Sequence, residues 1–303
     1  MDLIWLQNQY PLIVAGLAFT IGAVFGSFLN VVVYRLPKIM QRQWHDEAIQ
    51  IIEEENEDAK LSLGIKQHLN ETYEPFNLAV PSSSCPSCGA QIRPWHNIPI
   101  LSWFLLRGRC ADCNTKISPR YPSVEFATAL LTMLVIIEFG ATYQGIAACI
   151  FTWALITLAL IDFDTHLLPD DITILFLWLG LSANFFGLFV PLEEAFLGAI
   201  AGYLSLWTIY QLFKLTTGKE GMGFGDFKML AMLGAWLGVS AIPIIIIISS
   251  FAGAIVGVLL VLRDRNREKS IPYGPFLAIA GWIAMNWNEE LIVLYLDLTV
   301  RNV

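Results

Sequence analysis

Two aspartates stand where an apolar stretch of the chain meets a polar one. Asp162 follows the apolar run 151–161, and Asp226 ends the Gly-Phe-Gly-Asp stretch 223–226, just before another apolar run. Ionisable side chains at the edge of a membrane segment are costly to keep there, and so they are functional candidates by default. We expect Asp162 and Asp226 to be catalytic.

The chemistry that two such carboxylates support is peptide hydrolysis. Two carboxylates held close together do not easily both ionise, so the pair shares a proton. Such a pair can activate water while it protonates the leaving amine. A Ser/His/Asp set is the main alternative, but only one of the four histidines, His166, lies at a membrane edge. The pattern therefore favours an aspartyl peptidase.

The loop that follows Asp162 holds three more aspartates. Asp164 is the alternative catalytic residue, but Asp162 directly abuts the apolar run and is harder to solvate. We therefore prefer Asp162 and give Asp164 a supporting role. Asp170 and Asp171 follow a proline and precede an apolar run, so we interpret them as caps of the next helix.

The two glycines before Asp226 are also expected to support the site. Gly223 and Gly225 allow a positive φ and a close approach of the backbone to a substrate. Asp226 then falls in the first turn of the following helix, where the helix dipole favours the ionised form. We interpret Lys228 as an anchor at the membrane interface.

A second group of reactive side chains consists of two Cys-x-x-Cys pairs, Cys85 with Cys88 and Cys110 with Cys113. Twenty-one residues separate the pairs, which is close to the spacing of zinc ribbons. Four thiolates suit tetrahedral Zn²⁺ and leave no open position for a substrate, so we expect a structural metal. Two disulfides or a redox pair are the alternative.

The elements that position these groups must be membrane helices. The chain has 303 residues, of which 56% are hydrophobic and 15% charged, and a mean hydropathy of +0.59. Soluble domains carry about 25% charged residues. The net charge of −8 comes largely from the stretch 46–74, and no nucleic-acid partner is indicated. We expect an all-α polytopic protein in a lipid bilayer, with eight spans near 11–33, 122–140, 145–161, 172–190, 194–213, 227–240, 244–262 and 273–296.

Basic residues predict the orientation of these spans. With the N-terminus outside, 17 of the 18 Lys and Arg residues fall on the cytoplasmic side, and only Arg301 falls outside. Both aspartates and all four paired cysteines then lie on the cytoplasmic side, where disulfides are rare. The cytoplasmic segments in this arrangement are 34–121, 162–171, 214–228 and 263–272.

Three parts follow from this reading. Residues 1–33 contain the first transmembrane helix, 34–121 form a cytoplasmic domain with the four-cysteine zinc site, and 122–303 form a transmembrane aspartyl peptidase domain. The acidic stretch 41–80 is interpreted as one or two surface helices without chemistry.

Several motifs in this order resemble the bacterial type IV prepilin peptidases, which are bifunctional leader peptidases and N-methyltransferases. The likeness covers nearly the whole chain. Besides both cysteine pairs, it rests on the stretches 26–37, 97–103, 107–110, 120–125, 162–171 and 223–226.

The resemblance implies an aspartyl protease whose catalytic residues are Asp162 and Asp226. It also implies cleavage of prepilin and type II secretion pseudopilin leaders after a glycine, at the cytoplasmic face of the bacterial inner membrane. The new N-terminal residue is then methylated with S-adenosylmethionine. No GxGxxG stretch marks a site for that cofactor. Its candidate contacts are Asn30, Arg35, Arg93, Asn97, Arg107 and Glu125.

Two other functions compete with this one. A transporter or ion channel would place its intramembrane acids near the bilayer midplane, between broken helices. A metal-dependent transferase would use Asp162 and Asp164 to hold Mg²⁺.

Overall fold

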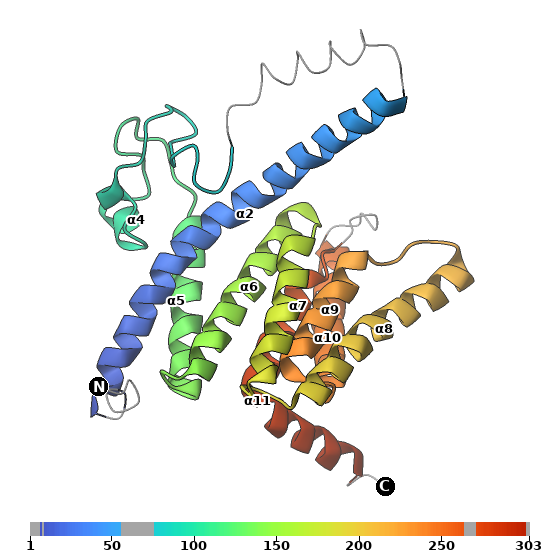
Figure 1. Cartoon of the computed structure of the whole chain (residues 1–303). Helices are drawn as coiled ribbons and strands as arrows, with labels where there is room; N and C mark the ends of the chain where they lie inside the picture. The colour runs from blue at the N-terminus through green and yellow to red at the C-terminus, as the bar shows by residue number, and fades with distance from the viewer. Residues whose placement is uncertain (1–6, 8, 56–75, 264–270, 301–303) are drawn as a thin grey trace. The chain divides into compact units, whose positions relative to one another are not determined.

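The computed structural model describes residues 7, 9–55, 76–263 and 271–300. Within these ranges the regular elements are helices, together with two isolated β-bridges (Figure 1). The elements are α2 (Pro11–Glu55), η1 (Pro94–His96), α4 (Leu101–Leu105), α5 (Arg120–Phe139), α6 (Tyr143–Thr165), α7 (Asp170–Phe185), α8 (Leu192–Thr217), α9 (Phe224–Leu237), α10 (Ala241–Arg263) and α11 (Gly274–Val300).

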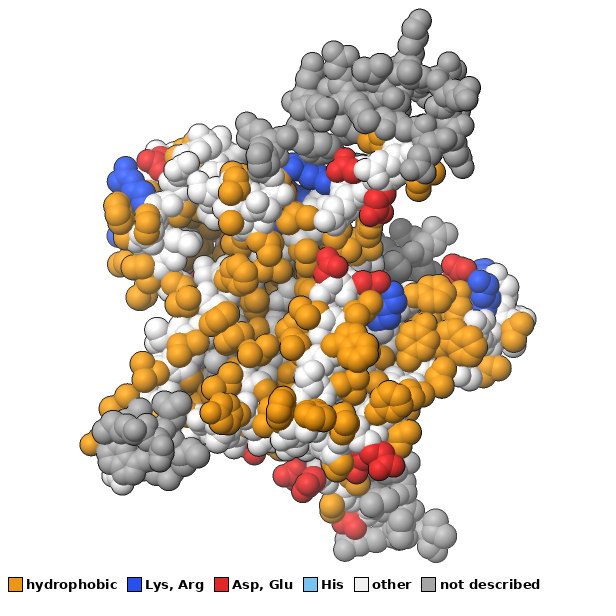
Figure 2. Space-filling view, viewed as in Figure 1, with side chains coloured by type: hydrophobic (Ala, Val, Ile, Leu, Met, Phe, Trp, Pro, Cys, Tyr) orange, Lys and Arg blue, Asp and Glu red, His pale blue; other side chains and the backbone are white. Residues whose placement is uncertain are grey.

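The all-α membrane class is confirmed. Among the described residues, five helices are long and apolar enough to cross a bilayer, namely α2, α5, α6, α8 and α10. Apolar side chains cover much of the visible surface (Figure 2), and on α10 Phe251 is 68% exposed. Helices α7 and α9 have 16 and 14 residues, fewer than the ~20 that a full crossing needs.

Helix α2 continues beyond the span predicted at 11–33. It runs without interruption to Glu55 and includes Pro37. Of the acidic stretch 41–80, residues 41–55 are therefore an extension of the first helix and not a separate surface helix. Residues 56–75 lie outside the part of the chain that the structure describes.

The chain divides into two compact units. Residues 22–129 form one, which we call the cysteine unit, and residues 1–21 with 130–303 form the other, which we call the helical unit. Both α2 and α5 pass from one unit into the other. The division at 33 and 121 predicted above stays a prediction.

Helix α9 is the centre of the helical unit and contacts α7, α8, α10 and α11. Nearly all of its residues from Asp226 to Leu237 are buried. Glycines allow this packing, because a Cβ on Gly234 would overlap the carbonyl oxygen of Gly198 on α8, and one on Gly202 would overlap the carbonyl of Leu230. Small residues at helix contacts let backbones approach closely in membrane proteins.

The C-terminal end of α9 is held by the side chain of Asn184 at the end of α7. Its Nδ2 donates to the carbonyl oxygens of Ala235 and Trp236 at 2.9 and 3.0 Å, and its Oδ1 accepts from the backbone N–H groups of Phe189 and Val190. The last carbonyls of a helix lack partners within the helix. Asn184 therefore fixes α9 at the end opposite Asp226.

Candidate active site

Asp162 lies in the last turn of α6 and is only 5% exposed. Its Oδ2 accepts a hydrogen bond of 2.8 Å from the backbone N–H of Gly274, at the start of α11. A Cβ at Gly274 would lie 2.7 Å from that same oxygen. The absence of a side chain at Gly274 is therefore what lets the start of α11 reach the carboxylate.

Asp226 lies in the first turn of α9, as predicted, and is 8% exposed. The prediction of a positive φ for the preceding glycines is wrong. Gly223 is the N-cap of α9 with an extended backbone (φ −79°), and Gly225 lies within the helix. Gly225 is needed for another reason, because a Cβ there would lie 2.8 Å from the Cβ of Leu168.

The two predicted carboxylates come together although they are distant in the sequence. Asp162 and Asp226 are close enough for their negative charges to repel each other. The segments that carry them also touch, through the Leu168–Gly225 contact and through an ion pair of 2.6 Å between Lys228 and Asp170. Two buried acids on touching segments have the chemistry to donate and accept protons, and their catalytic role stays a prediction.

The remaining aspartates of the first loop lie elsewhere. Asp164 is exposed, unlike Asp162. Asp170 and Asp171 do not cap α7 with their side chains, because Pro169 occupies the N-cap position. They lie in the first turn, where acidic residues complement the helix dipole. Lys228, interpreted above as an interfacial anchor, forms an ion pair with Asp170.

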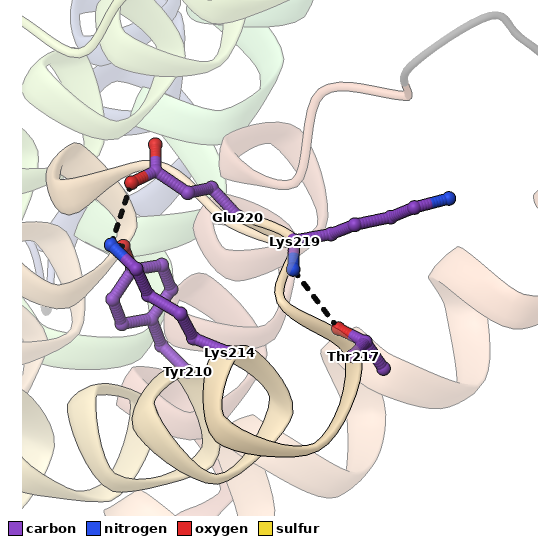
Figure 3. A network of polar contacts seen from close by, with 5 residues as sticks. All are labelled: Tyr210, Lys214, Thr217, Lys219 and Glu220. Atoms are coloured by element: carbon purple, nitrogen blue, oxygen red, sulfur yellow. Dashed lines mark hydrogen bonds and ion pairs between the residues drawn. The ribbon is translucent and has the colours of Figure 1, made fainter.

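The loop that leads from α8 to Asp226 is fixed by a polar network (Figure 3). Lys214 Nζ lies 2.8 Å from Glu220 Oε1 and donates to the hydroxyl of Tyr210 at 3.2 Å. The hydrogen bond from Lys214 lowers the pKa of Glu220, which keeps it ionised. The Tyr210 ring contacts Phe224 and Phe227, on either side of the Gly-Asp pair. These contacts orient the chain that enters α9.

Both aspartates lie at helix ends, and this bears on the transporter alternative. Asp162 is in the final turn of a long helix, and Asp226 is in the first turn of a short one. A transport site of the kind considered above would use positions near the middle of the membrane.

The four paired cysteines cluster within the cysteine unit and could hold a metal ion. Their Sγ atoms all lie within 4.8 Å of one another, and those of Cys85 and Cys113 are 3.7 Å apart. Four sulfurs bound at about 2.3 Å to a central Zn²⁺ lie about 3.8 Å apart in a regular tetrahedron. The sulfur positions therefore fit Zn²⁺.

The two cysteine pairs have the same backbone geometry. In each pair, the backbone carbonyl oxygen of the first cysteine accepts a hydrogen bond from the N–H of the residue four positions later. These residues are Gly89 and Asn114, at 2.9 and 3.1 Å. Gly89 and Asn114 both have a positive φ, of 71° and 57°. Glycine and asparagine are the residues that adopt this conformation most readily. The matching turns bring both sulfur pairs to one point.

The candidates for contacts with S-adenosylmethionine divide into two groups. Asn30, Arg35 and Glu125 hold the cysteine unit together: Arg35 donates to three backbone carbonyls of residues 77–81, Asn30 to that of Tyr121, and Glu125 accepts from the N–H of Ile100. The other three candidates, Arg93, Asn97 and Arg107, are exposed. A role of these six residues in binding S-adenosylmethionine stays a prediction.

One residue of the site was missed in the sequence. Gly274 is 112 positions from Asp162 and belongs to no motif recognised above. A glycine directly before a proline at the start of an apolar run was the available signal.

Comparison with known proteins shows the family of the chain. A family described as "Bacterial Peptidase A24 N-terminal domain" matches residues 20–139, and the "Type IV leader peptidase family" matches residues 149–258. Relatives named "Prepilin leader peptidase/N-methyltransferase" occur in Pseudomonas aeruginosa (49% identical, 98% of both chains), Pseudomonas putida (50%, 91% of both) and Neisseria gonorrhoeae (44%, 91% of both). No solved structure matches the chain.

Proposed function

Because the chain belongs to the type IV leader peptidase family, we propose that it cleaves the leaders of type IV prepilins and type II secretion pseudopilins. Cleavage follows a glycine, and the new N-terminal residue is then methylated with S-adenosylmethionine. The observation that carries the peptidase is that Asp162 and Asp226 are buried on separate helix ends, whose flanking residues touch through Leu168 with Gly225 and Asp170 with Lys228. The names of the relatives support both activities.

In this mechanism the two aspartates share the proton transfers of hydrolysis. One carboxylate takes a proton from water as the water oxygen attacks the scissile carbonyl carbon. The other carboxyl group donates a proton, and the amine leaves protonated. Burial of both side chains excludes competing bulk water and strengthens the electrostatic interactions in the site.

The proposed substrate suits an active site at the cytoplasmic edge of the bacterial inner membrane, with the N-terminus of the enzyme in the periplasm. A pilin precursor combines a basic leader with one apolar helix. The helix can enter the membrane while the basic leader stays in the cytoplasm. The peptide bond between them then lies at the membrane edge, and so do acids at helix ends.

We assign the four cysteines a structural Zn²⁺ within the cytoplasmic domain proposed at 34–121, which precedes the proposed peptidase domain 122–303 in the sequence. Four thiolates complete the coordination of zinc, so the metal contributes folding energy and no chemistry. Cys85, Cys88, Cys110 and Cys113 are the ligands in this proposal.

Cleavage of a model prepilin by the purified full-length enzyme tests the proposal. We expect Asp162→Asn and Asp226→Asn each to lower the rate at least about a thousandfold, as removal of a group in a catalytic unit does. Asp164→Asn is the matched control and should retain cleavage within a few fold of the original. Retained cleavage in either Asp162→Asn or Asp226→Asn would remove that aspartate from the mechanism.

A further inference from the structure

The segment between α10 and α11 contacts both the buried core and the candidate catalytic residue. The Tyr273 hydroxyl lies 2.7 Å from the Oγ of Ser249, which is fully buried on α10. The next residue, Gly274, donates its N–H to Asp162 at 2.8 Å. A short chain of contacts therefore runs from α10 through Tyr273 and Gly274 to the carboxylate.

We propose that Gly274, Tyr273 and Ser249 are positioning residues of the peptidase, which hold the carboxylate of Asp162 in its reactive orientation. The inference rests on the proposed function. In it, Gly274 supplies the hydrogen bond to Oδ2, and the Tyr273–Ser249 pair fixes the backbone from which that bond is made.

In the first turn of α11, the N–H of Gly274 is available to a partner outside the helix. Pro275 has no N–H. The N–H groups of Phe276 and Leu277 both point to the carbonyl oxygen of Tyr273, at 3.0 and 3.2 Å. The first N–H groups of a helix require partners from outside it. Asp162 is that partner for Gly274, and the bond satisfies a donor and an acceptor together.

The ends of the two helices make this bond electrostatically favourable. Asp162 lies at the C-terminal end of α6, where the helix dipole disfavours a negative charge. Gly274 lies at the N-terminal end of α11, where the dipole favours one. The dipole at the start of α11 therefore stabilises a negative charge on Asp162 that the dipole of α6 destabilises.

Glycine is required at position 274 for steric reasons. A Cβ would lie 2.7 Å from Oδ2 and 3.1 Å from Cγ of Asp162, so the carboxylate would have to move. The hydroxyl pair acts one residue earlier in the chain. Ser249 is fully buried, and its Oγ also donates to the carbonyl oxygen of Ile246 at 3.2 Å, so this hydroxyl keeps a partner when that of Tyr273 is removed.

The test compares the kinetics of conservative variants on a model prepilin. Tyr273→Phe keeps the ring and removes the hydroxyl, and Ser249→Ala removes the nearer of the two serine hydroxyls that this group contacts. We expect each to lower kcat for leader cleavage roughly tenfold, as loss of one buried hydrogen bond does, with KM unchanged. Tyr273→Phe removes both contacts of the hydroxyl, with Ser249 and, at 3.3 Å, with Ser250, so the double variant should fall no further than Tyr273→Phe. Tyr203→Phe is the matched control, since Tyr203 packs on Phe227 in the same unit.

Gly274→Ala should lower kcat more than a hundredfold, whereas Gly257→Ala on α10, whose Cβ would make an ordinary contact of 3.5 Å with Ile271, should not. A second readout separates positioning from folding. Methylation of an already cleaved pilin and the melting temperature should stay unchanged in Tyr273→Phe.

Wild-type kcat in Tyr273→Phe and Gly274→Ala, or an equal loss of cleavage, methylation and melting temperature in both, would overturn the inference. Asp162→Asn, measured alongside, reports on the proposed function. If it cleaves normally, the peptidase assignment of Asp162 fails. If it is inactive while the Tyr273 and Gly274 variants are unaffected, the positioning role alone fails.

Discussion

The helical unit and the cysteine unit position their functional groups in different ways. In the helical unit, backbones touch at Gly198 and Gly234, and the packed helix ends bring two distant carboxylates together. In the cysteine unit, two matching turns present four sulfurs within 4.8 Å. The helical unit thus depends on close helix packing, whereas the turns of the cysteine unit gather four sulfurs that could hold a metal ion.

Removal of the zinc should have the largest effect on stability of the changes considered. It should also distinguish the cysteine unit from the helical unit, because it should impair one activity more than the other. Structural Zn²⁺ contributes on the order of 10 kcal/mol to the folding of small domains. We expect Cys85→Ser to lose zinc and to impair N-methylation or overall stability more than leader cleavage. Zinc content and both activities of the purified variant check this. Cys149→Ala, which removes a buried thiol of the helical unit, is the control and should keep its zinc. Equal zinc content in Cys85→Ser and wild type would contradict the assignment.

Crowding the contact between α8 and α9 should impair the helical unit and leave the zinc in place. Gly234→Ala places a Cβ against the carbonyl of Gly198. Overpacking of this kind costs about 1–3 kcal/mol or more. We expect a lower melting temperature and slower cleavage, with zinc content unchanged. Gly16→Ala is the control, because a Cβ there meets nothing within 4 Å. A variant at position 234 as stable as wild type would show that the close approach is not needed.

The ion pair between Asp170 and Lys228 should contribute least. Its side chains are 52% and 33% exposed, and exposed pairs contribute about 0–1 kcal/mol. We expect Lys228→Met, Asp170→Asn and the double variant to cleave within roughly fivefold of wild type. A double-mutant cycle measures the coupling of the two residues. A coupling above about 2 kcal/mol would mean that charge, and not packing, holds the segments around Asp162 and Asp226 together.

Many of the candidate site residues could be identified from the sequence, because they lie at abrupt changes of polarity or at fixed spacings. Asp162 and Asp226 flank apolar runs, and the cysteines form two equally spaced pairs. The details that were wrong depend on contacts between distant segments. Asp170 contacts Lys228 instead of capping α7, and Gly225 faces Leu168 without a positive φ.

Two further features of the fold could not be predicted from local sequence patterns. The role of Gly274 follows from a hydrogen bond across 112 positions, and no local pattern encodes such a bond. Helix α2 runs to Glu55 and includes polar residues after position 33. Hydropathy alone marks only where its apolar part ends. Periodicity and composition therefore identify membrane helices better than they predict how these helices meet.

The most direct test of the central claim is the cleavage rate of the Asp162→Asn/Asp226→Asn double variant beside the two single variants. Two carboxylates that act as one unit are not additive, so the double variant should be no slower than either single variant. If the losses instead multiply, the two aspartates contribute independently, and the shared catalytic site described here is wrong.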